Sequence, residues 1–105
     1  DRQVVIGAAP ISVADIRLIE AREHHVHVTL EGQTVTQRAR LSDIVAQTRP
    51  EDGFQPHRSW WVSARTAHRL ERDGQKHVLY LDDGTRIPVA RTRLDAVRDW
   101  LEQHG

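Results

Sequence analysis

The sequence contains no cysteine and no methionine, and only 5% of its residues are aromatic. Without cysteine, disulfide bonds, thiolate metal ligands and thiol nucleophiles are excluded, so core packing alone must hold the fold together. A reducing, cytoplasmic environment suits such a chain. No run of 18 or more apolar residues is present, so the sequence offers no membrane-spanning helix. With 38% hydrophobic and 29% charged residues, the composition is that of a globular domain.

The length of 105 residues predicts one domain over residues 1–105, with residues 1–10 as a leading segment. The chain lacks an initial methionine and any charged-then-apolar leader. We therefore expect a domain taken from a longer protein whose additional part precedes residue 1. That part could alternatively hold the domain at a membrane.

The formal net charge is zero, which at first argues against a polyanionic partner. The charge is unevenly distributed, however. Residues 1–52 carry six basic and eight acidic residues, residues 53–94 carry eight and four, and residues 95–105 carry one and three. Arginine, whose planar guanidinium binds phosphate or guanine through two hydrogen bonds, supplies 14 of the 15 basic residues. The middle segment thus favours an anionic partner, with chance clustering as the alternative.

Alternation of polar and apolar residues predicts strands over 15–20, 25–30, 34–39, 64–71, 76–81 and 85–90. Gly32 and the pair Asp83-Gly84 supply the turns of two hairpins. The proline residues Pro10 and Pro88 belong on edges or at strand starts. Residues 25–30 should turn the side chains of Val26, Val28 and Leu30 to the core. The pattern indicates an antiparallel sheet or sandwich.

Two helices are also predicted. Ser42-Asp43 can cap a short one, which ends before Arg49-Pro50 because a residue preceding proline avoids helical dihedral angles. Thr92 can cap a second helix over residues 93–103. An apolar stripe on this helix should pack on the sheet and consists of Leu94, Val97, Trp100 and Leu101.

Three motifs stand out along the chain. Residues 15–21 read Asp-Ile-Arg-Leu-Ile-Glu-Ala and residues 54–63 read Phe-Gln-Pro-His-Arg-Ser-Trp-Trp-Val-Ser. Residues 82–91 read Asp-Asp-Gly-Thr-Arg-Ile-Pro-Val-Ala-Arg. Together they resemble the LytTR family (LytR/AlgR type), the DNA-binding domains of bacterial transcription regulators that lack a helix-turn-helix. Their order and spacing agree with the family from about Ile11 to Leu101. Ser63, Ala90 and Trp61 depart from the family pattern, which puts polar contacts at the first two positions in doubt.

The resemblance implies a mainly β fold, an elongated stack of small antiparallel β-sheets with a short middle helix and a C-terminal amphipathic helix. It further implies sequence-specific binding of double-stranded DNA by loops that reach two successive major grooves and the intervening minor groove. The protein would be the output domain of a response regulator in a two-component system, paired through its parent protein on repeated half-sites. The implied DNA-binding residues are Arg22, His24, His25, His57, Arg58, Ser59, Arg91 and Arg93.

The chemistry of these residue types agrees with that role. Arg91 and Arg93 can each offer two donors to guanine, whereas Arg58 suits the negative potential of a narrow minor groove. Either His24 or His25 could be the base-reading histidine. As alternatives, Arg58 and Arg91 could pair with Asp82 and Asp83, and His57 could be a structural imidazole. Touching three grooves from one face would require the duplex to bend.

Other functions find less support in the sequence. His25 and His27 share one strand face, but two histidines make an incomplete zinc site, so we expect no metal. Ser59 beside His57 lacks an orienting acid, so we expect no enzyme, no cofactor and no small-molecule substrate. Trp60 and Trp61 should point to opposite faces, one to the core and one to the surface. The main competing hypothesis is a β-domain that binds another protein and no DNA.

Overall fold

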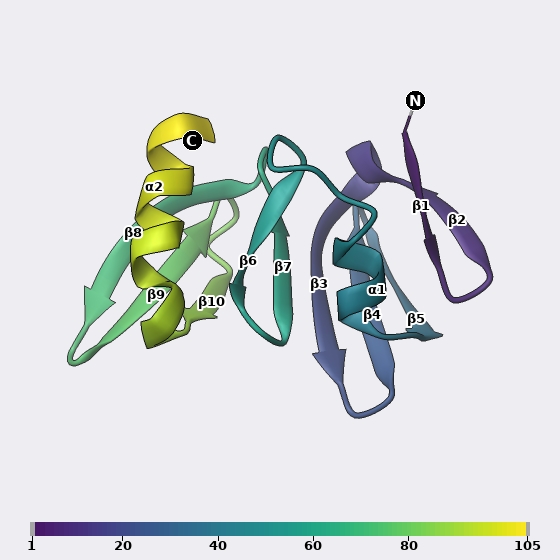
Figure 1. The fold of residues 1–105 in the computed structure, drawn as a ribbon, viewed down its shortest axis with the longest axis horizontal. Coiled ribbons are helices and arrows are strands. Elements are labelled where there is room, and N and C mark those ends of the chain that lie inside the picture. Colours follow the sequence, from purple (N-terminus) through teal and green to yellow (C-terminus); the bar gives the residue numbers. More distant parts are fainter. Residues whose placement is uncertain (1, 105) are drawn as a thin grey trace.

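The computed structural model describes residues 2–104, and these form three antiparallel sheets that lie side by side along an axis of 39 Å (Figure 1). A hairpin of β1 (Gln3–Ile6) and β2 (Ala9–Ser12) forms the smallest sheet. The largest has the order β5-β4-β3-β7-β6, and the third has the order β10-β9-β8. The predicted stack of small antiparallel sheets is confirmed.

Six strands of the two larger sheets lie where the sequence predicted strands, and two more, over residues 53–57 and 60–63, were not predicted. The central sheet contains β3 (Ile16–Arg22), β4 (His25–Leu30), β5 (Gln33–Arg38), β6 (Gly53–His57) and β7 (Trp60–Ser63). The third contains β8 (Ala67–Asp73), β9 (Lys76–Leu81) and β10 (Arg86–Val89). Both predicted hairpins are present, because Gly32 (φ 78°) and Gly84 (φ 88°) adopt the left-handed conformation that their turns require. Pro88 lies on the edge strand β10, as predicted.

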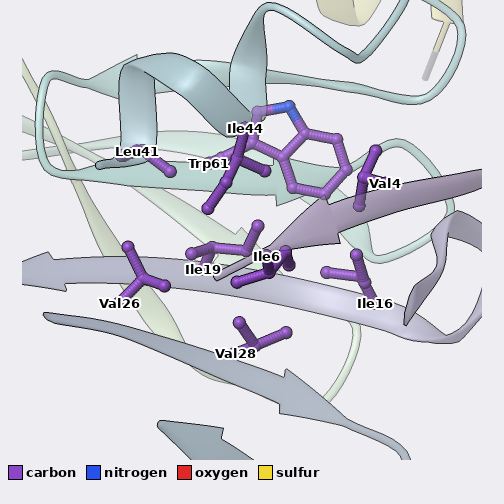
Figure 2. Close-up of a cluster of buried hydrophobic side chains, with 9 residues drawn as sticks. All are labelled: Val4, Ile6, Ile16, Ile19, Val26, Val28, Leu41, Ile44 and Trp61. Atoms are coloured by element: carbon purple, nitrogen blue, oxygen red, sulfur yellow. The ribbon is translucent and has the colours of Figure 1, made fainter. Parts of the chain in front are cut away.

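The first hydrophobic core joins the N-terminal hairpin to the central sheet. Figure 2 shows its side chains converging between β1, β3, β4 and a short helix: Val4, Ile6, Ile16, Ile19, Val26, Val28, Leu41, Ile44 and Trp61. Val4 and Ile6 come from the leading segment, for which the sequence had indicated no element, and both are fully buried. Residues 3–12 are therefore an integral part of this core.

The second core joins the central sheet to the third sheet and the C-terminal helix. It consists of Leu18, Val62, Leu79, Leu81 and Ile87, with Phe54, Trp60 and Leu101 packed against it. Consecutive strand residues point to opposite faces, so Trp61 enters the first core and Trp60 packs on the second. The expectation of a surface tryptophan at one of these positions is thus wrong, because both faces of β7 are covered.

Two helices complete the described chain. The short helix α1 (Leu41–Val45) begins after Arg40, so Ser42 and Asp43 lie inside it and do not cap it. Burial of Leu41 explains the earlier start. Before α2 (Leu94–His104), residues Arg91–Arg93 form one 3₁₀ turn, which includes Thr92. No helix within residues 2–104 is long and apolar enough to cross a bilayer.

The apolar stripe of α2 packs against the strands, as predicted. Val97 and Trp100 are buried, and Leu101 contacts the second core. The ring of Trp100 stacks on Phe54 at 4.1 Å between centroids, and its Nε1 donates a hydrogen bond of 2.8 Å to the carbonyl of Pro50. These contacts fix α2 beside β6, and its first residue follows directly on the 3₁₀ turn.

Candidate nucleic-acid interface

Strand order brings three separate turns to one edge of the molecule. β3 pairs antiparallel with both β4 and β7, so the β3–β4 and β6–β7 turns lie at the same end of the sheet. The Ala21 N–H donates to the Ser59 carbonyl at 2.8 Å, and the Ala90 N–H donates to the Pro56 carbonyl at 2.9 Å. The β10–α2 connection therefore adjoins the β6–β7 turn (Figure 1, lower edge). We call residues 22–25, 57–59 and 91–93 the loop edge.

The β3–β4 turn presents three exposed candidate residues, Arg22, His24 and His25. Its first turn residue, Glu23, has a φ of 56°, which side-chain-bearing residues rarely adopt. The Nε of Arg22 lies 3.5 Å from the Glu20 carboxylate. His24 lines a surface hollow together with Arg58 of the next turn, whereas His25 does not. The geometry thus brings His24, rather than His25, together with the central arginine.

The β6–β7 turn combines a free cation with a fixed imidazole. Arg58 is exposed, and no ion pair or side-chain hydrogen bond engages its guanidinium within residues 2–104. His57 is half-buried, and its Nδ1 accepts a hydrogen bond of 3.1 Å from the Ser59 N–H. Since a backbone N–H can only donate, the neutral ring carries its proton on Nε2 and presents a donor there. The structural imidazole weighed from the sequence is therefore present.

The same contact bears on the Ser59–His57 pair. The group of Ser59 bonded to the imidazole is its backbone N–H, not its hydroxyl. Within the described chain, no hydrogen bond joins the Ser59 hydroxyl to His57. The pair is therefore not arranged as a nucleophile and its base.

The β10–α2 connection separates its two arginines. Arg91 is exposed, lacks a carboxylate partner within the described residues, and lines a second hollow together with His57. Arg93 is half-buried, and its Nη1 donates to the Gln55 carbonyl at 3.2 Å. Arg93 thus ties the connection to β6, while Arg91 stays free.

Carboxylates gather instead at the opposite ends of the strands. Arg17 pairs there with Asp82, with Glu31 at 3.2 Å and with Asp83 at 3.4 Å. The hydrogen bond to Asp82 is the largest cause of the raised pKa of Arg17. Since Asp82 and Asp83 are engaged by Arg17, the alternative that they pair with Arg58 or Arg91 is wrong.

Two further arginines line the hollow of His24 and Arg58, and sequence reasoning missed them. Arg38 is the last residue of β5, and Arg40 precedes α1; both are exposed. The only signal in the sequence is their spacing around Ala39, which puts two cations on one side of an extended segment.

The histidine-dense β3–β4 hairpin does not gather ligands for a metal. Among the residues that the structure describes, no group of three or more His, Asp or Glu side chains could hold a metal ion. His27 lies with its Nδ1 3.1 Å from the Thr36 hydroxyl on the paired strand.

Comparisons with known proteins agree with the fold. Residues 7–102 match the family model described as the LytTr DNA-binding domain. The fold is similar to the LytTr DNA-binding domain of a Bacillus cereus protein described as a methyl-accepting/DNA response regulator, with a TM-score of 0.80 and 20% identity over 96% of this chain and 98% of that one. No curated protein matches the sequence.

Proposed function

The chain belongs to the LytTR family of DNA-binding domains, as its motifs indicated, and on this premise we propose that it binds double-stranded DNA sequence-specifically as the output domain of a bacterial transcription regulator. One observation carries the proposal. The loop edge presents exposed arginines, Arg58 and Arg91, that have no carboxylate partner in the described chain. A polyanion supplies the missing counter-charge.

The order of the turns supports a division of the grooves among them. The β6–β7 turn lies between the other two, so Arg58 would enter the minor groove while Arg91 and His24 reach the flanking major grooves. The long axis of 39 Å slightly exceeds one helical turn of DNA, about 34–36 Å. That length suits contact with successive grooves on one side of a duplex.

The remaining candidate residues have supporting roles in this proposal. Arg93 and the Ser59 N–H are used within the protein, so they would hold the turns in place. His57 would offer its Nε2 donor to the DNA. Arg22 and His25 are exposed at the end of the β3–β4 hairpin and would contact phosphates.

The proposal extends to the setting of the domain. Since bacterial DNA is cytoplasmic, the domain would act there, without a cofactor or small-molecule substrate. Two copies, brought together by the parent protein, would occupy repeated half-sites. A protein-binding β-domain is the competing hypothesis, and it gives no reason for two arginines without carboxylate partners in the described chain, Arg58 and Arg91, to lie at adjacent turns.

Fluorescence anisotropy with duplexes selected from a random library tests the proposal. For four to seven phosphate contacts, log affinity should fall with log salt at a slope of about −4 to −6. Arg91→Ala should cost about 1–3 kcal/mol, mainly at one base position, whereas Arg58→Ala should weaken binding most where the minor groove is narrow. Arg49→Gln is the control, because Arg49 is exposed and unpaired but precedes the far end of β6. Absence of salt-sensitive duplex binding would overturn the proposal.

A further inference from the structure

We infer that Arg38 and Arg40, with Arg58 and His24, form a binding site for one phosphodiester group of the DNA backbone. This site rests on the proposed function and deepens it, because Arg38 and Arg40 lie outside all three turns of the loop edge. The four side chains come from three different connections and line one hollow.

The backbone directs the two arginines to the same side. Arg38 pairs with His25 at the end of the β4–β5 ladder, and Arg40 is extended, with φ −101° and ψ 132°. Between them, Ala39 packs against the first core. Alternate residues of an extended segment face opposite ways, so Arg38 and Arg40 both point away from the core.

The segment is held in place before any ligand binds. The Arg40 carbonyl accepts hydrogen bonds from the N–H groups of Asp43 and Ile44, at 3.2 and 3.4 Å. Leu41 and Ile44 are buried on the other side of α1. Moving Arg40 would break the start of this helix and expose Leu41, so the site loses little backbone entropy when it binds.

The hollow has an excess of positive charge that the protein does not neutralise. Glu23 and Asp43 also line it, but within residues 2–104 neither forms an ion pair with the arginines there. Elsewhere, arginines such as Arg2 and Arg86 lie within 4 Å of a carboxylate. Neighbouring guanidinium groups repel one another, and a phosphate that accepts two hydrogen bonds from each removes that repulsion.

Position identifies the source of the phosphate. The hollow lies between the β3–β4 turn, proposed for a major groove, and Arg58, proposed for the minor groove. Adjacent grooves of a duplex are separated by one sugar-phosphate strand. A strand following that path would cross the hollow, which favours a DNA phosphodiester over a free anion.

The double variant Arg38→Gln/Arg40→Gln tests the site. It should weaken duplex binding at least about tenfold and equally for all sequences, since each charged hydrogen bond contributes about 1.5–3 kcal/mol. The salt slope should become less negative by about 0.9, because one phosphate contact is lost. The matched control, Arg49→Gln/Arg98→Gln, removes the same charge from exposed positions outside the hollow. Its salt slope should stay within about 0.5 of that of the unsubstituted domain. Unchanged thermal melts of both variants establish that they are folded.

The outcomes separate this inference from the proposed function. If the unsubstituted domain binds duplex DNA with a steep salt slope and the Arg38/Arg40 variant keeps that slope, only the phosphate site is overturned. If the unsubstituted domain binds no duplex DNA, the proposed function fails as well. A titration with inorganic phosphate, followed by NMR of the arginine Nε–H groups, supplies the third arm. Saturation of the arginine signals by inorganic phosphate, together with an unchanged DNA salt slope for the Arg38/Arg40 variant, would identify a free-anion site and refute the inference.

Discussion

Replacing Gly53 with alanine should strongly destabilise the domain through a close contact beneath Trp61. Gly53 is buried at the start of β6, opposite Ser63 on β7. A Cβ added there would lie 2.2 Å from the Val62 carbonyl oxygen and 2.5 Å from Cζ2 of Trp61. Both separations are far below van der Waals contact, and the nearest atom belongs to backbone. The β6–β7 pair would have to separate, or Trp61 would have to leave its place in the core.

The expected cost is about 3 kcal/mol, at the upper end for overpacking a core. With an unfolding entropy of about 2.1 cal/mol/K per residue, the 105-residue chain should melt about 14 °C lower. Gly74→Ala is the control, since Gly74 has a φ of 64° but no atom within 4 Å of an added Cβ. Left-handed strain alone should cost it about 1 kcal/mol.

Thermal and urea unfolding followed by circular dichroism measure both variants. Adding Trp61→Phe to Gly53→Ala should recover only part of the loss, because the Val62 carbonyl oxygen remains in contact. Full recovery would show that the ring is the whole obstacle. A Gly53→Ala melting temperature equal to that of Gly74→Ala would refute the close-packing argument.

Substitutions at three further positions test local features. Glu23→Gly should stabilise the fold by about 1 kcal/mol, because glycine adopts a φ of 56° without strain, and it should also tighten DNA binding. Glu23→Gln should tighten DNA binding only. Equal melting temperatures of the two variants would contradict backbone strain at position 23. Burial raises the pKa of Asp52, but hydrogen bonds from Arg2 and a backbone N–H outweigh it, so the pKa is lowered. Its stabilisation is complete above about pH 3.9 and is lost as the pH falls through the lower folded-state pKa. Asp52→Asn should therefore flatten the dependence of unfolding free energy on pH below about pH 4, and a parallel curve would exclude this linkage. Trp100→Phe should cost about 1–2 kcal/mol in urea unfolding, because the Pro50 carbonyl loses its donor, and no change would exclude that contribution.

The hairpins could be predicted because their determinants are local. Alternation from His25 to Leu30 and a glycine at position 32 define strand, face and turn within a few residues. The β1–β2 hairpin escaped prediction because each strand has four residues, too few for a periodic signal to exceed chance. Its position depends on the turn that follows α1, since the side chain of Gln47 donates to and accepts from the backbone of Val5 at 3.0 and 2.8 Å. No local pattern encodes that long-range contact.

The candidate site was predictable in part for the same reason. Family motifs place the three turns, and the structure brings those turns to one edge. Which cations are free could not be predicted, because Arg93 is engaged by the carbonyl of Gln55 on a neighbouring strand. Arg38 and Arg40 were missed since their hollow forms only when the β5–α1 connection meets the β3–β4 and β6–β7 turns.

A net charge of zero is compatible with DNA binding because charges are paired unevenly over the molecule. The Arg17 guanidinium pairs with the carboxylates of Glu31, Asp82 and Asp83 and offsets one of their three charges, at the ends of strands remote from the loop edge. Arg58 and Arg91, which face DNA in our proposal, have no carboxylate partner among the described residues. At physiological ionic strength, charges more than about 8 Å apart are largely screened, so phosphates respond to the nearest groups rather than to the molecular total. Replacing Arg17 should therefore change stability far more than DNA affinity, whereas replacing Arg58 or Arg91 should change DNA affinity far more than stability.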